Sequence, residues 1–191
     1  MKKILVMLAE GVEEVEALTV VDVVRRAGVK CDTCSLGEKE VTSSHNVKII
    51  ADKNINDNDI KDYDGIVCPG GIPGAPNLRD NEKVIETIKS FYKEGKLVAA
   101  ICAGPIVLAR AGVTEGKKVT SYPGFKKDLG NCDYKEDLVV RDENIITSRG
   151  PATAMLFAYE ILRYLGLEDK CKEVHDAMLF NLLKDRITTL K

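Results

Sequence analysis

The residue best placed to do chemistry is a cysteine between an apolar strand and a helix start marked by glycine and proline. The strand residues Leu97–Ile101 run directly into Cys102, and Ala103, Gly104 and Pro105 follow. Such a turn holds a thiol in front of the free N–H groups of a helix, which stabilise a thiolate and any oxyanion that it creates. A cysteine taken at random is more often a small buried hydrophobe, but this context favours a nucleophile.

A second source of backbone donors follows another buried strand. Residues Gly65–Cys68 are apolar and stop at Pro69, Gly70 and Gly71. The first strand, 3–8, similarly ends at Glu10 and Gly11. Because the carboxyl ends of parallel strands meet at one edge of a sheet, we expect these three breaks to converge on an oxyanion pocket beside the thiol.

Glu16 is the candidate acid-base group. The helix predicted over 12–27 has one apolar face. On a helical projection, four residues of that face lie within about 40° of Glu16. These residues are Val12, Val20, Val23 and Ala27. A carboxyl group on this face has three interpretations. The predicted orientation of the helix is wrong, or the acid is buried with its hydrogen bonds satisfied, or it is a functional group with a raised pKa. Periodicity alone does not decide between the structural and the functional interpretation.

Composition sets the limits for this site. The chain has 191 residues, of which 45% are hydrophobic and 30% charged, so one core can form without metals or disulfides and we predict a single domain over 1–191. The net charge is -2, and the lysines and arginines are scattered along the chain. This charge pattern argues against nucleic acid or a membrane surface as a partner. The apolar segment 4–9 is too short for a signal core, so we expect a cytoplasmic protein.

The six cysteines indicate reduced thiols and not a disulfide or metal framework. Cys31 and Cys34 have redox-pair spacing but fall in a predicted strand, 29–36, where positions three apart point to opposite faces. Cys68 ends a buried strand and is interpreted as packing. Since no cysteine and histidine spacing is typical of a zinc site, we expect no metal and no other cofactor.

Short apolar runs alternate with helical patterns along the chain. Strands are predicted at 3–8, 29–36, 65–68, 97–101, 119–121, 138–141 and 144–148, an extended ribbon at 41–51, and helices at 12–27, 77–93, 103–111, 151–165 and 170–183. This order predicts an α/β protein, a flavodoxin-like, doubly wound sandwich with a mostly parallel central sheet.

Four segments carry a family resemblance. Residues 11–16, 69–71, 99–105 and 147–151 resemble, in order and spacing, the motifs of the ThiJ/PfpI superfamily, above all its branch of Parkinson disease protein 7 and bacterial homologues. The resemblance spans nearly the whole chain. It implies that Cys102 is an oxidisable nucleophile, that Glu16 is hydrogen-bonded to its sulfur, and that the N–H groups of Gly71 and Ala103 form an anion pocket.

The resemblance also implies a homodimer, formed through the first helix and the nearby ribbon. It assigns further residues to the oxyanion or substrate pocket: Gly70, Tyr122, Arg149, Gly150 and Pro151. Arg26 and His45 are assigned to the pocket or the dimer interface. His45 falls where the branch has an arginine, and a solvated histidine of the ribbon is the alternative interpretation.

The chain departs from many relatives in lacking a histidine close to the nucleophile. Ala103 and Tyr122 occupy the two positions where relatives place one, and the two histidines present are His45 and His175. A cysteine peptidase or glutaminase needs an imidazole base to turn over its acyl enzyme, so the sequence disfavours these activities. Tyr122 donates a hydrogen bond but is a poor base at neutral pH.

Two functions from different classes remain. The first is glutathione-independent glyoxalase chemistry on small 2-oxoaldehydes such as methylglyoxal, extending to early glycation adducts on proteins, with Cys102 as nucleophile and Glu16 as proton shuttle. The second is an oxidative-stress sensor or redox-regulated chaperone that acts through oxidation of Cys102. An enzymatically silent homologue is the third possibility.

Overall fold

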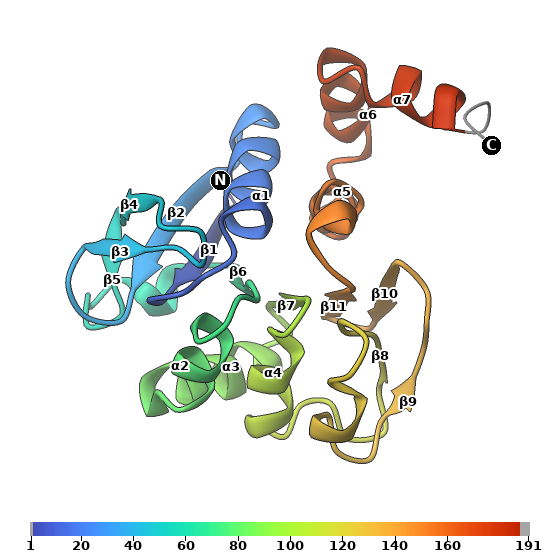
Figure 1. Cartoon of the computed structure of the whole chain (residues 1–191). Coiled ribbons are helices and arrows are strands. Elements are labelled where there is room, and N and C mark those ends of the chain that lie inside the picture. The colour runs from blue at the N-terminus through green and yellow to red at the C-terminus, as the bar shows by residue number, and fades with distance from the viewer. Residues whose placement is uncertain (1, 188–191) are drawn as a thin grey trace.

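A seven-stranded sheet runs through the middle of the protein. The computed structural model describes residues 2–187, and Figure 1 shows the sheet with its helices. The strand order is β10-β11-β7-β6-β1-β2-β5, and β10 with β11 is the antiparallel pair among parallel neighbours. The strands are β1 (Lys3–Leu8), β2 (Lys30–Ser35), β5 (Lys53–Asn54), β6 (Gly65–Cys68), β7 (Leu97–Ile101), β10 (Val139–Asp142) and β11 (Ile145–Ser148).

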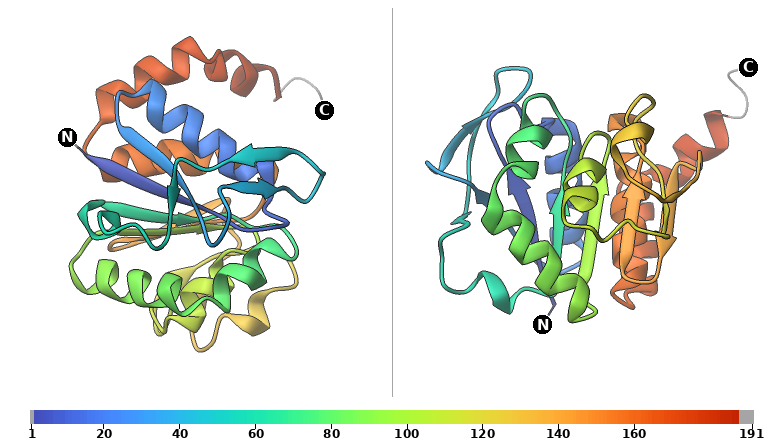
Figure 2. Two further views of the ribbon diagram at one scale, coloured as in Figure 1. Left: turned by 90° about the vertical axis from the view of Figure 1, so that its left-hand side faces the viewer. Right: turned by 90° about the horizontal axis from the view of Figure 1, so that it is seen from below.

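The helices form two layers, one on each face of the sheet (Figure 2). One layer contains α1 (Glu14–Arg26), α5 (Ala154–Tyr164) and α6 (Glu168–Ala177), followed by α7 (Phe180–Ile187), and the other contains α2 (Gly74–Arg79), α3 (Glu82–Lys93) and α4 (Pro105–Arg110). Because successive strand residues face opposite sides, Ile4 and Val6 join the core under α1, and Leu5 and Met7 join the core against α3. The predicted flavodoxin-like sandwich is confirmed.

The chain changes its winding direction at β1. It runs from β1 outward to β2 and β5, then returns to β6 on the other side of β1 and continues to β7 and β11. The carboxyl ends of β1, β6 and β7 therefore lie together at the switch point, where doubly wound sheets bind ligands. The three breaks predicted to converge all begin at these strand ends.

Smaller elements complete the fold. The predicted ribbon is an antiparallel pair, β3 (Glu40–Thr42) with β4 (Lys48–Ile50), and β8 (Lys118–Val119) pairs with β9 (Asp133–Tyr134). Single 3₁₀ turns are η1 (Ile60–Asp62), η2 (Lys126–Asp128) and η3 (Pro151–Thr153). The ribbon is fastened to the end of β1, because Gly11 N donates to Thr42 O at 2.8 Å and Ser44 N to Val12 O at 2.8 Å.

Two segments that were each predicted as one helix form two helices in the structure. The helix predicted over 77–93 is α2 and α3, because the Asn81 side chain accepts a hydrogen bond from Val84 N and starts a new helix. The helix predicted over 170–183 is α6 and α7, separated at Leu179, whose φ of 57° is left-handed. Within residues 2–187, no helix combines the length and the apolarity needed to cross a membrane.

Cys31 and Cys34 behave as their strand spacing predicts. Cys31 belongs to the core under α1, whereas Cys34 belongs to the core on the opposite face of the sheet. Both thiols are free, as are those of the other cysteines. Burial raises the pKa of each of these two thiols to about 12, so neither is prepared for redox chemistry.

Candidate active site

Cys102 stands on a strained turn between β7 and α4. Its φ of 63° lies in the left-handed region that residues with a side chain rarely adopt. Two backbone hydrogen bonds hold the turn, since Cys102 N donates to Ser148 O at 3.0 Å and Cys102 O accepts from Tyr122 N at 2.9 Å. A nucleophile on such a strand-to-helix turn projects beyond the edge of the sheet, where a substrate can reach it.

Backbone N–H groups surround the sulfur. The N–H groups of Ala103 and Gly71 both lower the pKa of the Cys102 thiol and so favour its thiolate. Gly71 has a φ of 89°, and a Cβ there would come within 2.2 Å of Gly11 O. The loop after β6 therefore requires glycine in order to bring its N–H to the thiol. The predicted convergence of the loops is confirmed.

The Glu16 carboxyl is buried between α1 and this loop. Its side chain has no exposed surface, and Oε2 accepts a hydrogen bond from Gly70 N at 2.7 Å. Oε1 is also buried and accepts no hydrogen bond, which makes it the oxygen that would carry a proton. Burial, with a smaller contribution from the charge of Glu13, raises the pKa of Glu16 to about 7, against the lowering effect of the Gly70 N–H group.

Cys102 and Glu16 titrate as a pair. Burial of the sulfur and the adjacent Glu16 carboxylate raise the pKa of Cys102, while the Ala103 and Gly71 N–H groups lower it. The two groups are close together, since Cys102 Cβ and Glu16 Oε2 lie 2.8 and 2.9 Å from the position that a Cβ on Gly70 would take, and each shifts the pKa of the other. When Glu16 carries the proton, its repulsion of a thiolate disappears and it becomes a hydrogen-bond donor. The reactive form is thus a thiolate beside a neutral acid.

The segment after β11 borders the same turn, since Ser148 accepts the Cys102 N–H. The Tyr122 side chain is 47% exposed, and its ring lies 3.4 Å from the position that a Cβ on Gly150 would take. Arg149 is half-buried, and its buried Nη1 makes no hydrogen bond. Pro151 begins η3 and is exposed. The structure thus places residues 149–151 and Tyr122, which were predicted from the sequence, beside the turn that carries Cys102.

Arg26 and His45 do not contact Cys102 within this chain. Arg26 lies ten residues, or about 15 Å, along α1 from Glu16, and its Nε donates to Asp22 at 2.8 Å. His45 Nδ1 lies 3.0 Å from Glu14 Oε1 and 3.7 Å from Glu13 Oε2. The hydrogen bond to Glu14 raises the pKa of His45. Their assignment to an interface remains a prediction.

The Glu13, Glu14 and His45 cluster is also the one group in residues 2–187 with metal-ligand spacing. Glu13 is the N-cap of α1 and Glu14 lies in its first turn, where the positive end of the helix dipole opposes a cation and favours the carboxylates themselves. Pairing with His45 accounts for the cluster.

Two contributors to the site were missed from the sequence. Ser148 acts through its carbonyl, which any residue type provides, so no side-chain pattern could reveal it. Glu13 acts through its backbone N–H, which donates to Gly70 O at 3.1 Å and fixes the loop beside Glu16. The sequence feature that marked this segment was the run of glutamates after Gly11.

Comparison with known proteins agrees with this site. The model of the DJ-1/PfpI family matches residues 2–164, which include Glu16, Gly71 and Cys102. This chain belongs to the DJ-1/PfpI family. The match confirms the resemblance expected from the four sequence segments.

Several DJ-1/PfpI relatives match nearly the whole chain. Protein dj-1beta of Drosophila melanogaster is 41% identical over 93% of this chain and 97% of its own length. Its crystal structure superposes with a TM-score of 0.89 at 42% identity over 93% of this chain and 97% of that chain. The Parkinson disease protein 7 homolog of Danio rerio is 41% identical over 86% of this chain and 89% of its own length. The structure titled "Toxoplasma gondii DJ-1, oxidized" has a TM-score of 0.88 at 34% identity, covering 94% and 98% of the two chains.

The DJ-1/PfpI site of this chain has no imidazole at either position named above, since Ala103 and Tyr122 stand there. His45 contacts glutamates, and the His175 ring packs against the Tyr159 ring with centroids 3.8 Å apart. The titratable side chain next to the thiol is therefore Glu16. The arrangement suits addition of a thiolate to a carbonyl carbon and transfer of a proton at that carbon.

Proposed function

We propose that this DJ-1/PfpI chain is a cysteine-dependent glyoxalase, which converts small 2-oxoaldehydes such as methylglyoxal to 2-hydroxy acids without glutathione. The observation that carries the proposal is the buried Glu16 carboxyl, which accepts the Gly70 N–H and lies next to the Cys102 side chain. An acid whose pKa is about 7 both gives and accepts a proton near neutral pH. That is the property a proton shuttle requires.

The first step is addition. The thiol proton passes to Glu16, and the Cys102 thiolate forms a C–S bond to the aldehyde carbon. The electron pair of the C=O bond moves to the oxygen, where the N–H groups of Gly71 and Ala103 stabilise the oxyanion. Glu16 then returns its proton to that oxygen, which leaves a hemithioacetal and a carboxylate.

The second step moves a hydrogen between carbons. The Glu16 carboxylate removes the C–H proton from the former aldehyde carbon, and the electron pair forms an enediolate whose negative charge lies on the neighbouring oxygen. The hydroxyl proton of the former aldehyde carbon passes to that oxygen, and Glu16 delivers its proton to the neighbouring carbon, which gives a thioester of the 2-hydroxy acid. Water then cleaves the C–S bond and releases the acid and the thiol. Each step uses a thiol, a carboxyl group and backbone N–H groups.

The test is a comparison of the native protein with Cys102→Ser and Glu16→Gln on methylglyoxal, following both substrate loss and lactate. Loss of either group is expected to lower lactate formation by about 100-fold or more, the usual effect of removing a nucleophile or general acid-base group. Cys132→Ser is the matched control, because Cys132 is the other half-buried thiol. Native rates in both active-site variants would overturn the mechanism.

The same chemistry extends to early glycation adducts on proteins: the carbinolamine loses water to give an iminium, the thiolate adds to that carbon, and the protein amine then leaves after taking up a proton from Glu16, while water adds to the carbon. An assay with preformed adduct and a scavenger of free aldehyde separates direct release from removal of free methylglyoxal. Continued release of unmodified protein under the scavenger supports a direct deglycase.

Controlled oxidation of Cys102 is the second candidate function. The Ala103 and Gly71 N–H groups would donate hydrogen bonds to the sulfinate oxygens, and protonated Glu16 would donate to one of them, which stabilises this oxidation state. The relative titled as oxidized DJ-1 supports the same idea for that protein. Intact-mass and peptide analysis after mild peroxide should find two added oxygens on Cys102. Equal oxidation of Cys132 would contradict a sensor.

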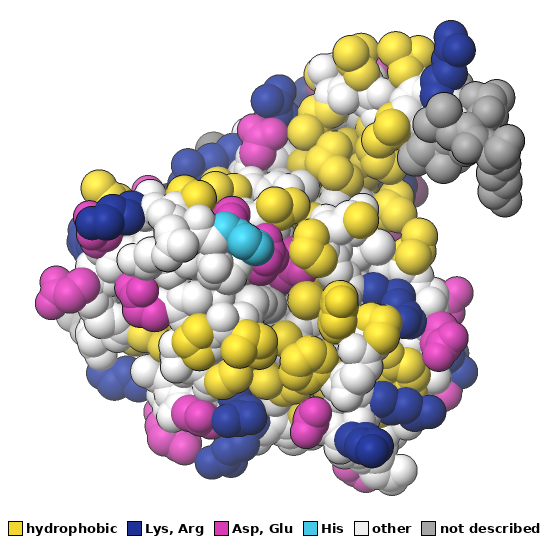
Figure 3. Space-filling model, viewed as in Figure 1, with side chains coloured by type: hydrophobic (Ala, Val, Ile, Leu, Met, Phe, Trp, Pro, Cys, Tyr) yellow, Lys and Arg dark blue, Asp and Glu magenta, His cyan; other side chains and the backbone are white. Residues whose placement is uncertain are grey.

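We also propose a homodimer formed through α1 and the ribbon. Val15 and Leu18 are exposed by 48% and 39% on α1, and Ile50 on β4 by 73%. Figure 3 shows further hydrophobic side chains gathered over the α5 and α6 region beside α1. Light scattering should report a dimer that Leu18→Glu dissociates. The control Leu138→Glu alters an exposed leucine before β10 and should leave the dimer intact.

A reducing compartment such as the cytoplasm suits this chemistry. All six cysteines are free, and the proposed nucleophile works as a thiolate. Fractionation with a compartment marker tests the location.

A further inference from the structure

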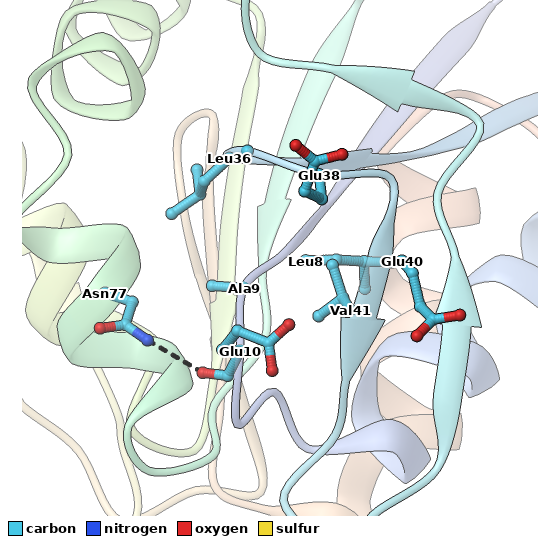
Figure 4. A pocket seen from close by; sticks show the side chains of 9 residues that line it. Leu8, Ala9, Glu10, Leu36, Glu38, Glu40, Val41 and Asn77 are labelled. Carbon is cyan, nitrogen blue, oxygen red and sulfur yellow. Dashed lines mark hydrogen bonds between the residues drawn. The ribbon is translucent and has the colours of Figure 1, made fainter.

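The ribbon of β3 and β4 lies against the end of β1. Figure 4 shows Val41 of β3 beside Leu8 and Glu10, at the end of β1 and in the turn after it. Val41 is buried, and Thr42 is held at both backbone groups, since its N–H donates to Glu10 Oε1 at 3.1 Å and its carbonyl accepts from Gly11 N at 2.8 Å. No histidine takes part in these contacts, which attach the body of the ribbon.

The tip of the ribbon, between β3 and β4, makes a different kind of contact. The side chains of Ser44 and His45 face two glutamates at the start of α1. His45 Nδ1 lies 3.0 Å from Glu14 Oε1 and 3.7 Å from Glu13 Oε2. Nitrogen and oxygen atoms of the imidazole and the two carboxylates lie within 4.8 Å of one another, so the three side chains form one cluster.

One hydroxyl group is shared among three partners in this cluster. Ser44 Oγ lies 3.2 Å from Glu13 Oε2, 3.4 Å from Glu14 Oε2 and 3.1 Å from His45 Nδ1. Because a hydroxyl has a single hydrogen, it donates to one of these atoms at a time. The other carboxylate needs the imidazole as its donor, and Nδ1 always carries a hydrogen when His45 is charged. The charged form therefore supplies donors to both carboxylates.

The charges of the cluster favour the same form of His45. The Glu13 and Glu14 side chains are 13% and 15% exposed, and no lysine or arginine of residues 2–187 forms an ion pair with them. The nearby Lys48 of the ribbon is paired with Glu40 at 2.8 Å. A neutral His45 thus leaves two adjacent carboxylates without a cationic side chain. The hydrogen bond to Glu14, followed by the charges of Glu14 and Glu13, raises the pKa of His45.

We propose that His45 is a pH-sensitive switch, which holds the tip of the ribbon on the start of α1 when it is charged. The switch adjoins the loop that positions Glu16, because Glu13 N donates to Gly70 O at 3.1 Å and Gly70 N donates to Glu16 Oε2. Since the pKa of His45 in the folded chain lies above the ordinary 6.5, the tip is held below pH 6.5 and released as the pH rises through the raised value. Any effect of the switch on turnover rests on the proposed function, but the switch itself is tested on the ribbon.

The test is amide hydrogen exchange of the ¹⁵N-labelled full chain at pH 6 and pH 8, corrected for the intrinsic exchange rate at each pH. The probe is the Ser44 amide, which donates to Val12 O at 2.8 Å across the attachment of the tip. In the native chain its protection should be about threefold lower at pH 8, the usual size of one exposed ion pair. His45→Gln, which has no charge, should show low protection at both pH values. His45→Arg, which keeps a charge, should show high protection at both.

Two controls separate the switch from other effects of pH. The Gly11 amide, which donates to Thr42 O in the body of the ribbon, reports any change of the whole fold. Glu40→Gln removes a ribbon acid outside the cluster and should leave the pH dependence of the Ser44 amide intact. Glu14→Gln removes the carboxylate nearest to His45 and should abolish this dependence.

Three results would each overturn the switch. The first is equal protection of the native Ser44 amide at both pH values. The second is a pH dependence of that amide that persists in both His45→Gln and His45→Arg. The third is a His45 imidazole signal that titrates at or below pH 6.5. Since none of these measurements uses an aldehyde, they leave the proposed glyoxalase to its own test.

Discussion

Glu16 Oε2 lies 2.7 Å from Gly70 N, and this hydrogen bond links the first helix to the loop that presents an N–H group to the thiol. The hydrogen bond fixes Oε2 of the carboxyl group, and Oε1 remains available to carry a proton. Position and protonation of Glu16 are therefore set by the same loop that supplies the oxyanion donor.

Stability should fall as pH rises because of Glu16. Its pKa in the folded chain is about 7 against an ordinary 4.5, so the folded state binds more protons than the unfolded state between these values. The stabilisation present below pH 4.5 is lost as pH rises through 7 and amounts to about 3 kcal/mol. Glu16→Gln, which stays neutral, should lose this dependence in urea unfolding at pH 5 and pH 8. Parallel pH curves for the variant and the native chain would contradict the assignment, and Glu86→Gln is the control.

Glu16→Gln should also lower the pKa of Cys102. The Glu16 carboxylate, after burial, is the group that raises the pKa of this thiol, and the amide removes its charge. The midpoint of alkylation rate against pH, measured by mass at Cys102, should shift downward. A Cys102→Ser sample gives the background from the other thiols. An upward shift would show that the carboxyl acts chiefly as a donor to the thiolate.

Gly70→Ala should damage the site more than the fold. A Cβ at this position would meet Cys102 Cβ at 2.8 Å and Glu16 Oε2 at 2.9 Å. The added methyl group pushes the carboxyl and the thiol apart, so methylglyoxal turnover should fall about 100-fold. Gly37→Ala, which meets nothing within 4 Å, should stay within about 0.5 kcal/mol of the native stability and retain activity.

Tyr122→Phe should keep the native rate within about twofold. The Tyr122 hydroxyl makes no hydrogen bond within residues 2–187, and its connection to the site is the backbone N–H that holds Cys102 O. Tyr122→Pro removes that donor and should lower turnover. A large loss in the phenylalanine variant, seen in kcat, would instead make the hydroxyl a participant in proton transfer.

Much of this site could be predicted from the sequence because its parts follow regular geometry. Strand ends locate Cys102 and Gly71, and the helical period places Glu16 on a buried face. The break between α2 and α3 could not be seen, because Leu78, Val84, Ile85 and Ile88 continue one apolar pattern through it. One capping side chain, Asn81, decides the break.

Features made by distant segments also escaped the sequence. Ser148 meets Cys102 only because β11 lies beside β7. The side-chain environment of such places depends on how the elements pack.

Because the backbone at Cys102 is left-handed, selection for activity and selection for thermal stability favour different residues at this position. Glycine adopts a φ of 63° without the cost of about 1 kcal/mol that a side chain incurs. Cys102→Gly should therefore be at least as resistant to heat as the native chain while being inactive. A library of variants screened for survival at high temperature would drift toward loss of the thiol, whereas one screened on aldehyde would retain the less relaxed turn.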